Sequence, residues 1–125
     1  MFFTAWATLA ALGVYFWTGV NAGRARIRHN IPAPSMDGPE DFQRSQRVQA
    51  NTLESLPLVL VPLWMCAWFL GDVWAAAGGL LWCAGRLAYA IGYYRDPARR
   101  EFGFVTGMVA CALLICGTMW GLLLR

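Results

Sequence analysis

Residues 44–57, RSQRVQANTLESLP, place Arg44, Arg47, Asn51 and Glu54 directly in front of an apolar run, LPLVLVPLWMCAWFL at 56–70. As a helix that run spans only about 22 Å, which is shorter than the roughly 30 Å hydrocarbon core of a bilayer. If a helix crosses a membrane here, some of the polar residues before the apolar run therefore have to lie within the edge of the membrane. Pro39 fits the first helical position, and the two acidic residues that follow it suit the positive end of a helix dipole. We expect one membrane-spanning helix over about 42–70.

Three more segments are long and apolar enough to cross a bilayer, at 2–22, 73–94 and 102–124. About 20 residues suffice for a transmembrane helix. The composition agrees, because 58% of the residues are hydrophobic and only 14% are charged, whereas soluble domains are about 25% charged. We expect an all-α fold, in which residues 1–125 form a single integral membrane four-helix bundle.

The chain has ten arginines and no lysine, and eight of the arginines lie in or beside two of the three links between these segments. The link at Gly71 and Asp72 carries none. Because cytoplasmic loops are rich in arginine, the first and last links are expected to face the cytoplasm, with both termini outside. The membrane would be the inner membrane of a bacterium or the endoplasmic reticulum of a eukaryote. The arginines are scattered among apolar segments, which argues against nucleic-acid binding.

The first link, residues 24–39, is rich in proline and polar residues and is expected to be a loop, with His29 solvated. The segment at 2–22 lacks a basic start, so it is expected to be a retained span rather than a cleaved signal peptide. The four cysteines lie singly within apolar segments. We interpret them as small hydrophobic residues, and expect neither disulfides nor a metal site.

Small residues recur four positions apart in all but the second segment. Such pairs let helices approach closely in lipid, where van der Waals packing has to replace the hydrophobic effect. They favour a tight bundle and an oligomer. The pairs are Gly19 and Gly23, Ala75 and Gly79, Gly103 and Gly107, and Gly117 and Gly121.

Two helices carry polar stripes at the same cytoplasmic depth. On the second, Arg44, Arg47, Asn51 and Glu54 fall within an arc of roughly 80°. On the third, Arg86, Tyr89 and Tyr93 share one face. A charge at this depth costs about 2.5 to 3.5 kcal/mol, so it usually faces a bundle interior or a watery cavity. The convergence predicts a pocket for a small zwitterionic or anionic ligand.

Simpler interpretations of the same residues stay open. Arg44 and Arg47 could extend to lipid headgroups. Arg86 and Glu54 could form a structural ion pair between two helices. The tyrosines could belong to an interfacial aromatic belt.

The sequence that carries these two stripes resembles the MAPEG superfamily over nearly its whole length. These are the membrane-associated proteins of eicosanoid and glutathione metabolism. QRVQANTLESLP at 46–57 is similar to the family's second-helix pattern of Arg, Asn and Glu followed by Pro. GRLAYAIGYYRDPARR at 85–100 is similar to its third-helix pattern of Arg, two Tyr one turn apart, Pro and a further Arg. The resemblance is closest to the microsomal glutathione transferases.

The resemblance implies a homotrimer that binds glutathione between neighbouring protomers and uses it as co-substrate, without a metal. The implied catalytic residue is Arg100, which would hold the thiolate. The implied binding residues are Arg26 from the adjacent subunit, Arg47, Gln49, Asn51, Glu54, Arg86, Tyr89 and Tyr93. Two departures matter. Ser55 replaces a tyrosine found in some members, and the segment before Arg100 is one residue shorter, which leaves Arg99 as a rival.

The expected function is a membrane-bound glutathione transferase that acts on a lipophilic electrophile, and on lipid hydroperoxides as a peroxidase. The first alternative is a noncatalytic lipid-binding member of the same fold. The second is a small four-helix multidrug transporter, which fits less well because such exporters carry a membrane carboxylate in the first helix and residues 2–22 contain none.

Overall fold

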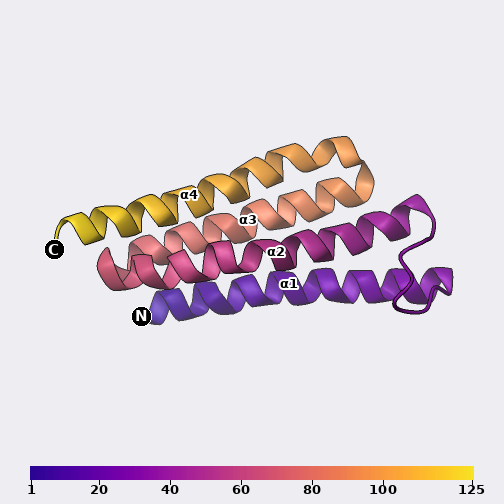
Figure 1. Ribbon diagram of the computed structural model, residues 1–125, viewed down its shortest axis with the longest axis horizontal. Helices are drawn as coiled ribbons and strands as arrows, with labels where there is room; N and C mark the ends of the chain where they lie inside the picture. The colour runs from indigo at the N-terminus through magenta and orange to yellow at the C-terminus, as the bar shows by residue number, and fades with distance from the viewer.

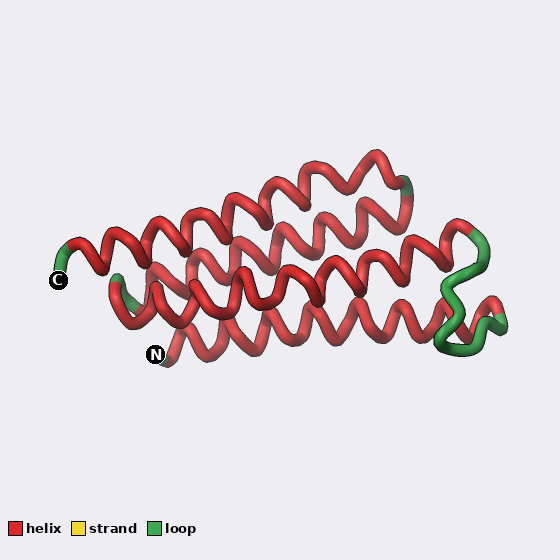
Figure 2. Tube along the Cα trace, viewed as in Figure 1, coloured by secondary structure: helices red, strands yellow, loops and turns green.

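The computed structural model describes all 125 residues. Four long antiparallel helices lie side by side, and both termini are at the same end of the bundle (Figures 1 and 2). The longest link and a short 3-10 turn lie at the opposite end. The predicted all-α bundle is therefore confirmed. The elements are α1 (Phe2–His29), α2 (Glu40–Phe69), α3 (Asp72–Arg95), η1 (Pro97–Arg100) and α4 (Glu101–Leu123).

The predicted loop at residues 24–39 is wrong over its first part, because α1 continues through the arginine-rich residues 24–29. Arginine is a good helix former, so the polarity of this segment ends the apolar span without ending the helix. The stop comes at Asn30, which adopts a left-handed conformation with φ 53°. The amide of Ile31 then donates to the carbonyl of Arg26 at 3.0 Å, as in a Schellman cap.

His29 is also not the solvated loop residue that was predicted. It ends α1, and its Nε2 lies 2.9 Å from Oδ2 of Asp41 at the start of α2. Its ring packs edge-on against Phe42. This contact joins the two helices across the link.

Close backbone packing joins α3 to α4 through glycine. A Cβ atom at Gly103 would overlap the backbone of Tyr89. Farther along α4, a Cβ at Gly121 would lie 2.6 Å from the carbonyl of Phe69 at the end of α2. These glycines are used within the protomer, so they do not support the predicted oligomer. Gly23 is different, since a Cβ there would meet nothing within 4 Å.

The outer surface of the bundle is apolar. Most of the exposed large side chains on the four helices are Leu, Val, Ile, Phe, Met and Trp. Three segments are long and apolar enough to cross a membrane, namely α1, α2 and Pro97–Leu123. The third helix falls below them in hydropathy because it contains Arg86 among several Gly, Trp and Tyr residues. It packs against the other three helices. That α3 also crosses the membrane remains a prediction.

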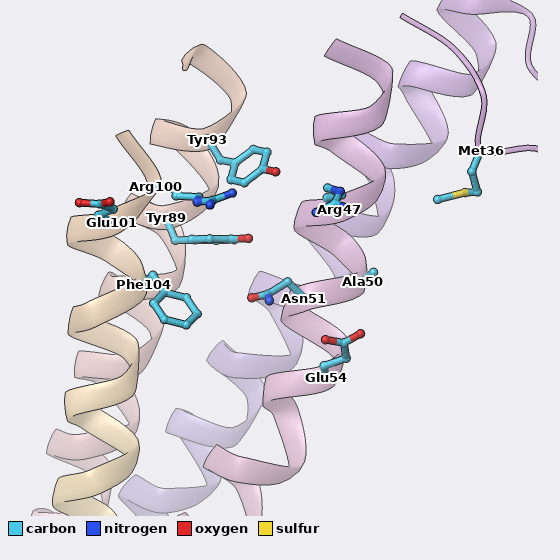
Figure 3. Close-up of a pocket in the computed structure, with 10 residues that line it drawn as sticks. All are labelled: Met36, Arg47, Ala50, Asn51, Glu54, Tyr89, Tyr93, Arg100, Glu101 and Phe104. Atoms are coloured by element: carbon cyan, nitrogen blue, oxygen red, sulfur yellow. The ribbon is translucent and has the colours of Figure 1, made fainter. Parts of the chain in front are cut away.

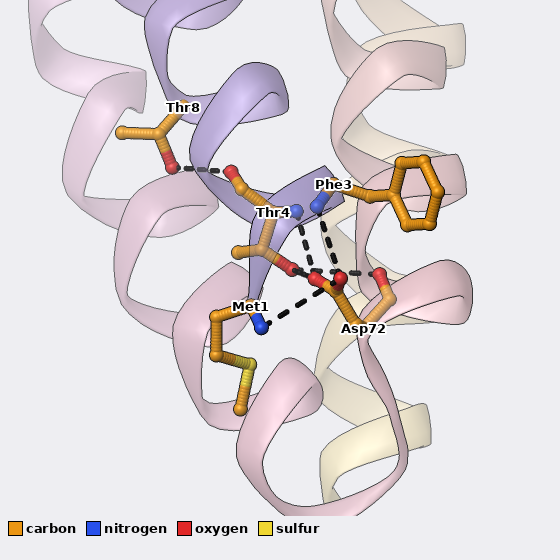
Figure 4. Close-up of polar contacts among 5 residues, drawn as sticks. All are labelled: Met1, Phe3, Thr4, Thr8 and Asp72. Atoms are coloured by element: carbon orange, nitrogen blue, oxygen red, sulfur yellow. Dashed lines mark hydrogen bonds and ion pairs between the residues drawn. The ribbon is translucent and has the colours of Figure 1, made fainter.

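Asp72, in the turn that begins α3, caps the N-terminus of α1 (Figure 4). Its carboxylate accepts the backbone amides of Phe3 at 2.9 Å and Thr4 at 2.8 Å, and the Thr4 hydroxyl at 2.6 Å. These amides lack partners within their own helix. The hydrogen bond from the Thr4 hydroxyl is the main cause that lowers the pKa of Asp72 from 3.8 to about 2. A residue of the third helix thus holds the first helix in place.

We expect Asp72→Asn to lower the Tm of the detergent-solubilised protein by a few degrees at neutral pH, because a charged cap becomes a neutral one. The pKa of Asp72 is lower in the folded state, so its stabilising effect is present above about pH 4 and is lost as the pH falls towards 2. The variant should lack this part of the acid dependence. Asp37→Asn in the exposed link is the control, and equal melting of the two variants would contradict the cap.

Candidate functional site

A cavity of about 700 Å³ opens near the end of the bundle that is opposite the termini (Figure 3). Its walls come from α2, from α3, from the start of α4 and from the link before α2. Figure 3 shows the two tyrosines and Arg100 directed across the cavity towards α2. The lining residues are Met36, Arg47, Ala50, Asn51, Glu54, Tyr89, Tyr93, Arg100, Glu101 and Phe104.

The α2 wall is the polar stripe predicted from the sequence. Arg47, Asn51 and Glu54 follow one another at intervals of four and three, so they share one helix face. Asn51 points towards Tyr89 and Phe104, whereas Glu54 lies towards the Met36 side (Figure 3). The stripe therefore offers a cation, an amide and a carboxylate along the cavity.

Arg44, predicted in the same stripe, does not line the cavity. Its Nη1 donates to the carbonyls of Tyr94 and Arg95 at 3.3 Å each, and its Nη2 lies 3.1 Å from Oε1 of Glu40. The last carbonyls of a helix lack partners within that helix. Arg44 therefore caps the C-terminus of α3 rather than extending to lipid headgroups.

The α3 wall consists of Tyr89 and Tyr93, both buried, with ring centroids 5.7 Å apart. Arg86 lies beneath them. Its side chain is only 3% exposed, its Cζ lies 4.1 Å from the Tyr89 ring centroid, and its Nη2 donates to Oγ1 of Thr52 at 2.7 Å. The ion pair between Arg86 and Glu54 that we considered is not formed. Arg86 instead supports the tyrosine wall through a cation–π contact and one hydrogen bond to α2.

The turn between α3 and α4 separates the two rival arginines. The Asp96 carboxylate accepts the amide of Ala98 at 3.0 Å, and Pro97 begins the 3-10 turn. Arg100 then lines the cavity, with its Cζ 5.4 Å from the Tyr93 ring centroid. Arg99 is exposed and does not line it. Of the two, only Arg100 faces the cavity.

Three of the predicted binding residues do not line this cavity: Arg86, which lies beneath the two tyrosines, and Arg26 and Gln49. Arg26 donates from Nη1 to the carbonyl of Ser35 at 2.8 Å, and its guanidinium lies over the Phe42 ring. Gln49 lies on the α1 side of α2, where a Cβ at Gly19 would be 3.3 Å from its Nε2. Neither side chain reaches the cavity from within one protomer.

The sequence reasoning missed four lining residues: Met36, Ala50, Glu101 and Phe104. Glu101 directly follows Arg100, and Phe104 follows one turn later, so their places along the chain were a usable signal. No pattern marks Met36, which reaches the cavity from the link after α1.

A smaller cavity of about 200 Å³ adjoins the first and shares Asn51, Glu54 and Phe104 with it. Apart from Ser55 and Arg86, its other walls are apolar, and they include Leu58 and Met108, which are exposed on the outside of the bundle. The two cavities together offer charged groups beside an apolar recess. No group of three or more His, Cys, Asp or Glu side chains could hold a metal ion.

The site is thus a mixed-charge groove. Arg47 and Arg100 supply cations and Glu54 supplies an anion, with tyrosine hydroxyls and an amide between them. This arrangement can hold a small ligand that carries both carboxylates and an ammonium group, and it can stabilise an anion near Arg100.

Comparison with known proteins gives matches that run from the first helix to the last. Residues 4–120 match the MAPEG family. Microsomal glutathione S-transferase 2 of Mus musculus is 40% identical over 92 residues, covering 74% of this chain and 63% of the relative. Leukotriene C4 synthase of Cavia porcellus is 34% identical over 119 residues, covering 94% and 79%. An uncharacterized protein of Synechocystis sp. is 38% identical over 116 residues, covering 93% and 85%.

Proposed function

Because the chain belongs to the MAPEG family of integral membrane proteins, we propose that it is a membrane-bound glutathione transferase that conjugates lipophilic electrophiles. The names of its relatives, a microsomal glutathione S-transferase and a leukotriene C4 synthase, support this class of reaction. The observation that carries the proposal is the position of Arg100 at the cavity, opposite the stripe of Arg47, Asn51 and Glu54.

The charges of the groove complement those of glutathione. Glu54 receives the γ-glutamyl ammonium, Arg47 binds a carboxylate, and Asn51 donates to or accepts from the peptide. Tyr89 and Tyr93 hydrogen-bond along the tripeptide, while Arg86 holds the tyrosine wall from below. Charge-assisted hydrogen bonds of this kind are about twice as strong as neutral ones. Ser55 stands where some members of the family have a tyrosine, so the contact of that tyrosine with the ligand is absent here; its hydroxyl donates instead to the carbonyl of Thr52.

Arg100 stabilises the thiolate, which is the nucleophilic form of the thiol. A free thiol has a pKa of about 8.5, and a nearby guanidinium favours the anion without losing its own proton. The thiolate sulfur attacks an electrophilic carbon, a C–S bond forms, and any leaving group departs with its electron pair. With a lipid hydroperoxide, two glutathione molecules give the alcohol, water and glutathione disulfide.

The apolar recess beside the groove supports a substrate that arrives from lipid. Leu58, Phe104 and Met108 line it or its edge, and all three are exposed on the outside of the protomer. A hydrophobic electrophile can therefore approach the sulfur from the bilayer while glutathione enters from the cytoplasm. Bringing both substrates to one place supplies much of the rate enhancement.

The first test is conjugation by the purified chain in detergent or vesicles. With glutathione and a generic aryl halide, we expect formation of the thioether to depend on both the protein and glutathione. A chain that binds lipid but forms no thioether, and reduces no hydroperoxide, would be the noncatalytic alternative. Measured efflux driven by protons from vesicles would instead indicate the transporter.

The positions of Arg26 and Gln49 support a site that is shared between protomers of a homotrimer. Both lie outside the cavity of their own protomer, and Glu54 lies at its open, exposed side. A neighbour could bring its first helix against that side. The shared site would then receive Arg47, Asn51, Glu54 and Arg100 from one protomer, and Arg26 and Gln49 from the next.

Subunit mixing tests this arrangement. Arg26→Ala and Arg100→Ala protomers are each expected to retain about a tenth or less of the wild-type turnover alone. When they are co-expressed in equal amounts, about a quarter of the shared sites regain both arginines, so turnover should recover to about a quarter of the wild-type value. A native mass of a monomer, or no recovery in verified mixed oligomers, would contradict the shared site.

A further inference from the structure

A second polar cavity, of about 320 Å³, lies on another side of the bundle and shares no residue with the glutathione groove. It is formed between α1, α2 and the C-terminal end of α3. The residues that matter are Trp17, Asn21, Arg24, Arg28, Asp41 and Tyr94. It lies at the arginine-rich end of the bundle, which is predicted to face the cytoplasm.

The cavity contains more positive charge than its own groups neutralise. Asp41 is already engaged, with Nε2 of His29 at 2.9 Å and Nη2 of Arg28 at 3.5 Å from its Oδ2. Arg24 forms neither a hydrogen bond nor an ion pair with the protein. A guanidinium in this position is available for an anion, and its planar fork suits phosphate oxygens.

A neutral donor accompanies the arginines. Asn21 donates from Nδ2 to the Tyr94 hydroxyl at 3.3 Å. That hydroxyl therefore acts as an acceptor towards Asn21 and keeps its own hydrogen for another partner. The cavity can offer both a charged and a neutral donor to one anion.

Next to the polar cavity, towards the middle of the bundle, the surface of α3 is apolar. On α3, Leu87 and Ile91 precede Tyr94 by seven and three residues, share its face, and are 38% and 45% exposed. On α1, Gly13 lies one turn before Trp17, and a Cβ there would meet nothing within 4 Å. A ligand that contacts both the polar cavity and this apolar surface has an anionic head and apolar chains.

We propose that this cavity binds the phosphate of an anionic phospholipid, with Arg24, Arg28 and Tyr94 on the headgroup and the acyl chains along the adjoining apolar surface of the bundle. Basic pockets between transmembrane helices on the cytoplasmic side recognise such headgroups. At 100° per residue, Arg24 and Arg28 lie about 160° to 200° around α1 from Arg26. The lipid site is therefore separate from the glutathione site and does not depend on it.

Native mass measurement of the full chain in a mild detergent tests the proposal. Dioleoyl phosphatidylglycerol and dioleoyl phosphatidylcholine are each titrated into the protein, and their binding is compared. We expect preferential binding of the anionic lipid, and a 10- to 30-fold loss of its affinity in an Arg24→Gln, Arg28→Gln double variant, since each arginine near an anionic lipid contributes about fivefold. The control is Arg99→Gln, which removes one charge at the same end of the bundle but outside the cavity.

A second variant guards against a folding defect. Arg24→Glu reverses the unpaired charge at an exposed position and should abolish the preference while leaving the helical circular dichroism unchanged. Equal binding of the two lipids by the wild type would overturn the proposal, as would a loss in Arg99→Gln as large as in the double variant. Displacement of the lipid by millimolar glycerol phosphate would assign the cavity to a soluble phosphate instead.

Discussion

Replacing Arg100 with alanine is expected to lower turnover about 10- to 100-fold at neutral pH and to leave the affinity for glutathione within a few-fold. To keep most of the bound thiol ionised near pH 7, the site has to lower the thiol pKa by roughly two, which corresponds to about 2.7 kcal/mol. One guanidinium at 4 Å supplies about 4 kcal/mol at an effective dielectric of 20, before desolvation is subtracted. Arg100 lines the cavity and is positioned to do this.

The measurement is thiolate absorbance of bound glutathione against pH, with the rate profile measured in parallel. In Arg100→Ala both should move towards alkaline pH. The matched control is Arg99→Ala, which removes the neighbouring charge from outside the cavity and should change either quantity little. If the thiolate titration matches the wild type in Arg100→Ala but is shifted in Arg99→Ala, then Arg99 is the thiolate partner. A shift in neither variant would remove the mechanism.

Glu54→Gln is expected to weaken glutathione binding by about 1.5 to 3 kcal/mol, or roughly 10- to 150-fold, which is the range for a hydrogen bond to a charged group. The substitution keeps the size of the side chain and removes the charge that faces the ligand ammonium. Because Glu54 is exposed and forms no ion pair within the protomer, the fold should be retained. Calorimetric titration of glutathione into the purified variant gives the loss of affinity.

Glu101→Gln is the control for this second experiment. Glu101 also borders the cavity, but its carboxylate points away from α2 (Figure 3). It should therefore change the affinity by no more than a few-fold. A larger loss of affinity in Glu101→Gln than in Glu54→Gln would mean that Glu101, and not Glu54, binds the ammonium group of the ligand. Unfolding of Glu54→Gln in detergent, under conditions where the wild type is stable, would make Glu54 a structural residue instead.

The helices and the faces that meet at the site were predictable from the sequence. The apolar lengths mark the four helices, and the intervals between Arg47, Asn51 and Glu54 place these side chains on one face. The same reasoning pairs Tyr89 with Tyr93. Such predictions succeed because a helix has a fixed rise and a fixed rotation per residue, so spacing along the chain determines direction about the axis.

Polarity was a poorer guide to where the first helix ends. Residues 24–29 lie outside the apolar span but remain helical, because arginine is a good helix former and its charged side chain is also well solvated. The end is set by Asn30, whose left-handed conformation closes the cap. The membrane-spanning segment and the helix need not end at the same residue, and the hydropathy of the sequence marks the end of the membrane-spanning segment more directly.

Only the tertiary structure decided which partner each side chain takes. Arg44 lies in the same stripe as Arg47, yet it caps α3 because the end of α3 is within its reach. The turn at Pro97 directs Arg100 into the cavity and leaves Arg99 outside it. Met36 arrives from a link that carries no periodic signal. Contacts between elements depend on turn geometry and on long side chains that can reach several partners, and local spacing along one helix contains neither.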